Sequence, residues 1–353
     1  MVTKYPFELK VISYVIGVSY DKFYKWYKYH LSDFKKPETQ VKLHQYDIKT
    51  GSETILVPLV KQEHIGKQMA IDEKHIDGQF YTILTNGQTG KVAMMASTVD
   101  STEIGKCLNY FGDSLKQVST ITRDLSPTYE KVATNYFSNA TQVADKYHIV
   151  QQAIESTQEL RIRYKQAALS TQRKEEKEHR QAYQTYKQCK EQGLARETVR
   201  KKYIPERLEN GETKPEFLSR CNYLLYKKSH QWTEKQRNRA TLLFKHYPEI
   251  EKAYEHILEF RNWYDPAINS SSFMYKEKQL WTWIYAVENC KIDEVLNFRN
   301  TVENNADYIL NYYKQYATNA IAESTNARIQ GYVRDNKGTR DIDFFHYRLG
   351  LVV

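Results

Sequence analysis

Three carboxylates on separate predicted elements could together hold metal ions. Asp72 ends one apolar, strand-like run (residues 68–72), and Asp124 ends another (residues 118–124). Glu323 lies far downstream, at the head of a strongly basic segment. Carboxylate oxygens are the hard ligands that Mg²⁺ and Mn²⁺ prefer, and two such ions about 4 Å apart serve phosphoryl transfer by activating one oxygen and stabilising another. The pattern therefore indicates metal-dependent chemistry on a phosphate backbone.

A further block, Asp145 with His148, leaves the choice of the middle acid open. Asp145 ends a later strand-like run (residues 141–145), and His148 follows it closely. A single histidine is more often a partly buried, hydrogen-bonded residue than a ligand. Acids at strand ends also commonly cap an element or face solvent, so spacing alone does not decide the assignment.

The chain is basic overall, which favours a polyanionic partner. Its 353 residues include 52 Lys and Arg against 43 Asp and Glu, a net charge of +9. Four cations follow Glu323 closely: Arg328, Arg334, Lys337 and Arg340. We expect them to hold the phosphates of a nucleic acid, because such contacts position a protein on the backbone without reading sequence. The alternative is an ordinary basic surface.

Membrane proteins and secreted proteins are disfavoured by the sequence. No stretch approaches the ~18 apolar residues of a membrane span, and the N-terminus has no apolar signal-peptide core. The four cysteines are scattered without a CxxC pair, so no structural zinc ribbon is expected within this chain. We therefore expect a cytoplasmic protein without a membrane partner.

Hydrophobic periodicity divides the chain into four predicted parts. Residues 1–66 form a short helical lead-in and a connector. Residues 67–150 follow the order β-β-β-α-β-α-β, which predicts an α/β fold with a mixed sheet covered by helices. Residues 151–310 are charged, aromatic and helical in period, and residues 311–353 hold a final helix and a basic tail. The expected strands cover residues 68–72, 79–85, 91–97, 118–124 and 141–145, and the expected helices cover residues 101–115 and 128–137.

Several blocks of the chain, in order, resemble those of one enzyme family. They are AIDE with YTILTN, then TRDLSPTY, NATQVADKYHIV and AESTNARIQGYVRDNKGTRDIDFFHYRL. Together they resemble the ISL-three family of DDE transposases, and within it the ISAon-one-like subgroup. The blocks span almost the whole chain, and their order makes the resemblance specific.

The resemblance implies an RNase H-like (retroviral-integrase-like) catalytic core, interrupted by a large all-α insertion before the last catalytic helix. It implies that Asp72, Asp124 and Glu323 hold two Mg²⁺ (or Mn²⁺) ions, with Asp124 favoured over Asp145 because the second family acid ends the fourth strand. Asp145 and His148 then become supporting groups. The implied activity is DNA strand cleavage and strand transfer at insertion-sequence ends, by a nucleoid-associated homodimer or larger assembly whose partners are the element ends and target DNA.

The chain also departs from the family pattern. The family usually carries a zinc ribbon and a helix-turn-helix before the catalytic core, so the expectation is that either a separate polypeptide supplies them or this copy is truncated. Within the last block, Ser324 and Gln330 stand where the pattern has Gly and Lys. Two alternatives stay open: a metal-dependent nuclease of the same fold, and an inactive DNA-binding relic.

Overall fold

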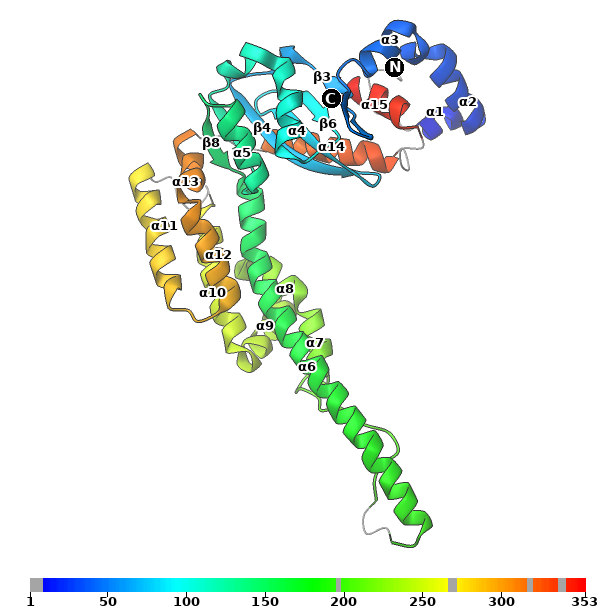
Figure 1. Ribbon diagram of the computed structural model, residues 1–353. Coiled ribbons are helices and arrows are strands. Elements are labelled where there is room, and N and C mark those ends of the chain that lie inside the picture. Colours follow the sequence, from blue (N-terminus) through cyan, green and yellow to red (C-terminus); the bar gives the residue numbers. More distant parts are fainter. Residues whose placement is uncertain (1–8, 195–197, 266–271, 316–319, 336–340) are drawn as a thin grey trace. The chain divides into compact units, whose positions relative to one another are not determined.

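The computed structural model describes residues 9–194, 198–265, 272–315, 320–335 and 341–353. The chain forms two compact units (Figure 1). The sheet unit comprises Met1–Lys146 and Asn305–Val353, and the helical unit comprises Tyr147–Asn304. The sheet unit is therefore built from two segments that are far apart in the sequence.

A six-stranded mixed sheet forms the centre of the sheet unit, in the order β3-β6-β5-β4-β7-β8. β4, β5 and β6 are antiparallel neighbours, whereas β4, β7 and β8 run parallel to one another. The strands are β3 (Leu59–Val60), β4 (Gln68–Ile76), β5 (Gln79–Asn86), β6 (Val92–Ala96), β7 (Thr120–Arg123) and β8 (Thr141–Ala144). The five strands predicted from the sequence all form, and the mixed α/β prediction is confirmed.

Local sequence explains the antiparallel half of the sheet. Asp77 and Gly78 join β4 to β5, and both have positive φ angles, 49° and 88°. This is the two-residue turn whose twist matches paired strands, and Asp-Gly is among its preferred sequences. Ile76 and Gln79 close the hairpin as a pair.

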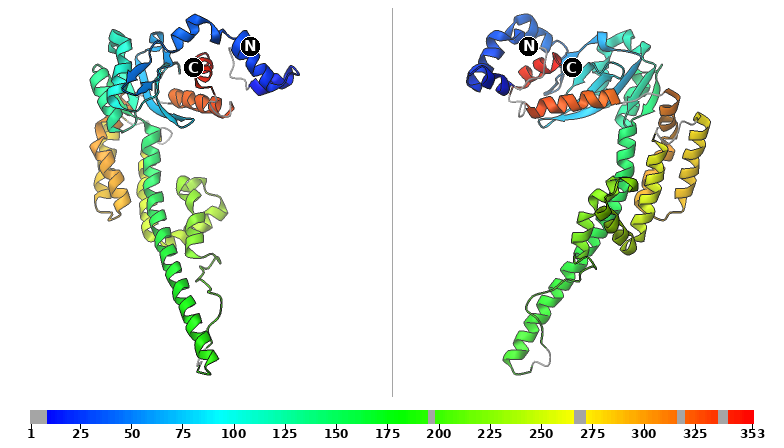
Figure 2. Two further views of the ribbon diagram at one scale, coloured as in Figure 1. Left: turned by 45° about the vertical axis from the view of Figure 1, so that its right-hand side comes forward. Right: turned by 180° about the vertical axis from the view of Figure 1, so that it is seen from behind.

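Helices cover both faces of the sheet (Figures 1 and 2). One face packs its apolar side chains, including Ile71 and Leu84, against α4 (Ser101–Leu108) and α5 (Pro127–Tyr136). The other face is covered by α14 (Ala320–Asp335) and α15 (Ile342–Gly350), which bury Tyr81 and Ile83. A further helix, α13 (Ala306–Gln315), packs beside β8.

The helix predicted over residues 101–115 is shorter than expected. Asp100, rather than Ser101, caps α4 by accepting hydrogen bonds from the backbone amides of Thr102 and Glu103. A 3₁₀ segment follows over Asn109–Gln117, and inside it Gly112 has a φ of 49°. This left-handed glycine ends the regular helical path.

The N-terminal part of the sheet unit contains more structure than a helical lead-in and a connector. Three helices, α1 (Leu9–Val15), α2 (Tyr20–Trp26) and α3 (Pro37–Leu43), pack around Phe344 of α15. The connector includes a small hairpin, β1 (Ile48–Thr50) and β2 (Glu53–Ile55), and the edge strand β3. These strands have only two or three residues, too few for an alternating pattern to be visible in the sequence.

The helical unit contains one long helix and six shorter ones within the described residues. They are α6 (Lys146–Glu191), α7 (Lys214–Arg220), α8 (Asn222–Tyr226), α9 (Glu234–His246), α10 (Pro248–Trp263), α11 (Phe273–Glu288) and α12 (Asp293–Asn304). The buried ring of Phe260 packs against Trp283 and Phe298, with ring centroids 4.8 and 5.0 Å away. Among the described helices, none is both long and apolar enough to cross a membrane.

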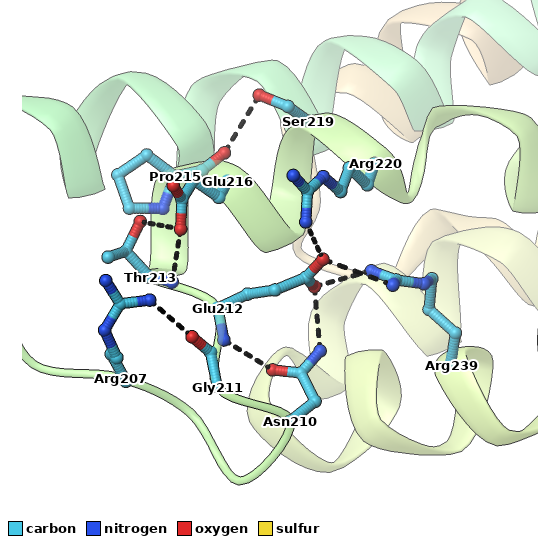
Figure 3. A network of polar contacts seen from close by, with 10 residues as sticks. All are labelled: Arg207, Asn210, Gly211, Glu212, Thr213, Pro215, Glu216, Ser219, Arg220 and Arg239. Atoms are coloured by element: carbon cyan, nitrogen blue, oxygen red, sulfur yellow. Dashed lines mark hydrogen bonds and ion pairs between the residues drawn. The ribbon is translucent and has the colours of Figure 1, made fainter.

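A buried carboxylate ties several segments of the helical unit together (Figure 3). Glu212 accepts hydrogen bonds from Arg239 of α9 at 2.7 Å, from Asn210 at 2.8 Å, and from Arg220 of α7. Hydrogen bonds from Arg239 in particular lower the pKa of Glu212 to about 2. The carboxylate is therefore charged at neutral pH and links the residues before α7 to α9.

Candidate active site on the sheet

Asp72 lies in the middle of β4 and faces α14. Contrary to the prediction from the sequence, it does not end a strand, because β4 continues to Ile76 and residues 73–76 pair with residues 79–82 of β5. The Nδ2 of Asn326 on α14 donates a hydrogen bond to Oδ2 of Asp72, with 2.5 Å between the two atoms. Oδ1 of Asp72 accepts a hydrogen bond from the backbone amide of Glu73, at 2.8 Å.

Asp124 follows β7 directly and lies level with Asp72. In the parallel pairing of β4 with β7, Ala70 is opposite Thr122. The same register continued by two residues brings Asp124 opposite Asp72. Opposed residues of parallel strands point to the same face, so both acids belong to the face that α14 covers. Oδ1 of Asp124 accepts a hydrogen bond from the amide of Ser126, at 2.9 Å, at the start of α5.

Asp145 extends this row of acids by one strand. Arg123 of β7 is opposite Ala144 of β8, so Asp145 is the neighbour of Asp124. It is buried, at 3% exposed, and its amide donates to the carbonyl oxygen of Arg123 at 2.7 Å. Because β7 separates β8 from β4, Asp124 is the nearer of the two acids to Asp72 in the sheet. His148 lies in the first turn of α6, which belongs to the helical unit.

Glu323 lies on the flank of α14 that is turned toward β7. The opposite flank contacts the turn between β5 and β6, where Thr325 and Arg328 both donate to the carbonyl oxygen of Gly90, at 2.8 and 3.2 Å. Glu323 shares its own flank with Gln330, two helical turns later, which donates to the carbonyl oxygen of His75 in β4. Since β4 lies between β5 and β7, this flank faces the strand that leads to Asp124.

The close approach of α14 to the sheet depends on a glycine. Gly90 has a φ of 70°, and a Cβ there would lie 3.0 Å from Cγ2 of Ile321 and 3.0 Å from Oγ1 of Thr325. A side chain would therefore meet the helix that carries Glu323. Glycine also adopts this left-handed backbone without steric cost.

The donor types fit a divalent cation, but the carboxylates do not form a closed cluster. Within the described residues, no group of three or more Asp, Glu, His or Cys side chains is arranged to hold a metal ion. Oδ1 of Asn326 is buried beside Asp72 and has no hydrogen-bond partner among those residues. An amide oxygen without a donor, next to a carboxylate, suits a hard cation. The chemistry of Asp72, Asn326 and Asp124 is thus compatible with Mg²⁺ or Mn²⁺.

The basic residues after Glu323 have different surroundings. Arg328 is exposed and already uses one nitrogen to hold Gly90. Arg334 is exposed, and its Nε lies 3.4 Å from Oδ1 of Asp335. Lys337 and Arg340 lie outside the described residues. Contacts of these four side chains with DNA stay a prediction.

Sequence reasoning missed two residues that hold the acids in place. Asn326 lies one helical turn after Glu323, and this spacing was the available signal. Arg123, next to Asp124, is 1% exposed; it donates to Gln142 and to the carbonyl oxygen of Asp124, each at 2.8 Å. Its guanidinium carbon lies 4.6 Å from the centre of the Tyr308 ring. Burial lowers the pKa of Arg123, and nothing in the sequence marks this cation as buried.

Comparison with known proteins identifies the family. A family described as transposase, of the ISL-three type of DDE transposases, matches residues 69–349. The match begins in β4 and ends in α15, so it covers Asp72, Asp124 and Glu323 as well as the helical unit. No curated protein and no solved structure matches the chain. Because the match covers far more than half of the residues, the chain belongs to the ISL-three family of transposases.

Proposed function

We propose that this transposase, a member of the ISAon-one-like subgroup, cleaves DNA at the ends of an insertion sequence and joins the freed ends to target DNA. One observation carries the proposal. Asp72 and Asp124 are level on neighbouring parallel strands, and α14 crosses the same face with Glu323 turned toward β7. This arrangement supports the proposal that the three acids act together on one face of the sheet.

The topology supports an RNase H-like core. In the sheet, β6, β5 and β4 are antiparallel neighbours, and β7 and β8 follow beside β4 and run parallel to it. Helices cover both faces. The segment between β8 and α13 would be the family's helical insertion, since it contributes no strand to the sheet in its described residues. In this fold the first acid lies on the central strand and the second follows the strand beside it, which favours Asp124 over Asp145.

Asp72, Asp124 and Glu323 would hold two Mg²⁺ or Mn²⁺ ions. When bound, such ions supply Lewis-acid stabilisation of the attacking and leaving oxygens. The chain itself orients the ligands: Asn326 fixes the carboxylate of Asp72, and Gly90 lets α14 approach the sheet. Water would add to phosphorus at the element end and release a 3′-hydroxyl, and that hydroxyl would then displace a 3′-oxygen in target DNA.

DNA is the expected partner, as element ends and as target. We propose that the protein acts in the nucleoid as a homodimer or a larger assembly, because both ends of an element must be joined. A separate polypeptide with a zinc ribbon and a helix-turn-helix would supply recognition of the terminal sequence. Asp145 and His148 are proposed as supporting groups.

The test uses a pre-nicked element end, a target duplex and Mg²⁺ or Mn²⁺. Joined products are expected from the unmodified protein, with losses of at least about 100-fold for Asp72→Asn, Asp124→Asn and Glu323→Gln. Glu73→Gln, beside Asp72 but exposed, is the matched control and should keep its activity. Retained cleavage in the Asp72 and Glu323 variants would refute the assignment.

The same experiment separates the alternatives. Degradation without joining indicates a nuclease. No cleavage, together with a melting temperature that Mg²⁺ leaves unchanged, indicates a DNA-binding relic, because a bound ion stabilises the native state. If Asp145→Asn loses all activity while Asp124→Asn keeps it, Asp145 is the middle acid.

A further inference from the structure

The positive charge of the chain is concentrated in one part of the helical unit. Residues 162–207 contain 13 Lys and Arg against six Asp and Glu, an excess of seven. The whole chain has an excess of nine, so the other 307 residues together are close to neutral. A charge distribution this uneven points to a localised site for a polyanion rather than to general solubility.

These residues form an arm, defined as residues 162–191 of α6 with the returning segment 198–207. The buried side chains of α6 all lie between Ile149 and Arg161, and none lies in the arm. Tyr203 of the returning segment donates to Oε2 of Glu175 at 2.6 Å, and its ring packs 5.7 Å from that of His179. The returning segment thus runs along one side of the helix (Figures 1 and 2).

The opposite side of the helix carries a basic stripe. Arg173, Lys177, Arg180 and Lys187 recur at intervals of four, three and seven residues, which places them on one face over about 21 Å. All four are exposed. Arg180 pairs with Glu176 at 3.5 Å and Lys187 pairs with Glu191 at 3.9 Å; both ion pairs are exposed to solvent and contribute little to stability.

The returning segment adds three exposed cations to the four of the stripe. Arg173 and Lys177 make no ion pair within the described residues, and neither do Arg200, Lys201 and Lys202 of the returning segment. The acids of the helix are already engaged: Glu175 by Tyr203, Glu178 by Lys174 at 3.9 Å. The cations therefore remain available for an external partner.

The apolar side chains of the arm do not suit a protein partner. Its large exposed apolar residues are Ile162 and Ile204, at 43% and 59% exposed. They do not recur at the spacing of three and four that a second helix would need. A polyanion fits this surface better than a coiled-coil partner does.

We infer that the arm binds the DNA backbone along its basic stripe, without reading base sequence. The choice of DNA as the polyanion rests on the proposed function; the binding surface itself does not. The four stripe residues extend over about 21 Å, more than half of one ~34 Å turn of B-DNA, so the stripe is long enough to contact several phosphates of one duplex.

The test is equilibrium binding of the full-length protein to a random-sequence duplex in EDTA, at several salt concentrations. The variant Arg173→Gln, Lys177→Gln, Arg180→Gln, Lys187→Gln removes the stripe with helix-compatible residues. We expect at least tenfold weaker binding near 0.1 M salt. The slope of log K against log salt should become shallower by about 3.6, at roughly 0.9 for each of the four lost phosphate contacts.

A matched control removes the same charge from the sheet unit, through Lys42→Gln, Lys49→Gln, Lys106→Gln and Lys131→Gln, all at exposed positions. It should bind within threefold of the unmodified protein. Equal loss in both variants, or no loss in the arm variant, would overturn the inference. So would sedimentation showing that the arm variant loses self-association, since the arm would then be a protein contact. Because no divalent ion is present, failure here leaves the cleavage test of the Asp72 variant unaffected.

Discussion

At the scale of single residues, Asn326 connects α14 to the acid it approaches. Its Nδ2 holds Asp72, while its Oδ1 is buried without a partner among the described residues. A buried amide oxygen without a donor costs free energy, so its presence beside a carboxylate points to a task outside stability. Holding Asp72 in one orientation is such a task.

Asn326→Ala should therefore lower strand cleavage by about 10- to 100-fold, the usual effect of removing a group that orients a metal ligand. The metal concentration needed for half-maximal cleavage should rise, whereas DNA affinity in EDTA should stay the same. Gln330→Ala is the control, because Gln330 lies on the same flank of α14 but donates its hydrogen bond to the His75 carbonyl oxygen, at 3.4 Å, and not to an acid. An unchanged metal dependence for Asn326→Ala would show that the residue only packs.

At the scale of elements, the position of α14 depends on Gly90. Both the backbone angle and the 3.0 Å approach of Ile321 and Thr325 exclude a side chain there. Gly90→Ala should lower the free energy of unfolding by about 2 kcal/mol, of which about 1 kcal/mol is backbone strain. The measurement is the urea midpoint together with cleavage activity.

The variant Gly51→Ala separates the effect of backbone strain from the effect of a clash with a neighbouring element. Gly51 has a similar φ of 59°, but a Cβ there meets nothing within 4 Å. This variant should lose only about 1 kcal/mol and keep full activity. If both variants lose the same stability and both remain active, contact between Gly90 and α14 is unimportant.

The packing of α15 makes stability depend on pH. His346 is 4% exposed, its ring lies 5.4 Å from that of Tyr81, and burial lowers its pKa from 6.5 to about 4. Nearby Asp47 raises this pKa slightly and His44 lowers it. As the pH falls, the histidine of the unfolded chain is protonated before the buried His346 of the folded chain. The stability of the fold that depends on a neutral His346 is therefore complete above pH 6.5 and is lost toward pH 4.

Urea unfolding between pH 7 and pH 4 checks this. The histidine alone should account for a loss of about 3 kcal/mol over that range. His346→Phe, which keeps an aromatic ring and cannot be protonated, should flatten the curve by that amount. Parallel curves for the two proteins would mean that His346 is not the group responsible.

At the scale of the whole molecule, the sequence was most informative where patterns are local. The strands between residues 68 and 144 were predicted within a few residues, because each shows apolar runs bounded by turn residues. β4 extends beyond the predicted residues 68–72, because its second half contains exposed side chains, such as Glu73 and His75, that interrupt the apolar run. That Asp72 and Asp124 are level could not be predicted, because register depends on pairing between strands 50 residues apart.

Contacts between segments that are far apart in the chain could not be predicted from the sequence either, because they also depend on long-range packing. The rotation of α14 is set by Gly90 and by the sheet, and neither is near it in the chain. The basic character of the chain was evident from composition, yet its concentration on the arm became clear only when the limits of burial in α6 were known.

The two-segment construction of the sheet unit has a consequence for synthesis. Thr325 and the Gly90 carbonyl that it contacts are separated by 235 residues, which a ribosome needs about 10 to 50 s to add at 5–20 residues per second. During that time the apolar side chains of β5 and β6 that later pack against Ile329, Tyr332 and Phe345 stay uncovered. The nascent chain thus carries Asp72 and Asp124 without Glu323, and an uncovered sheet is open to chaperones or to aggregation until α14 emerges. The proposed catalytic site can therefore assemble only after the whole helical unit has been synthesised.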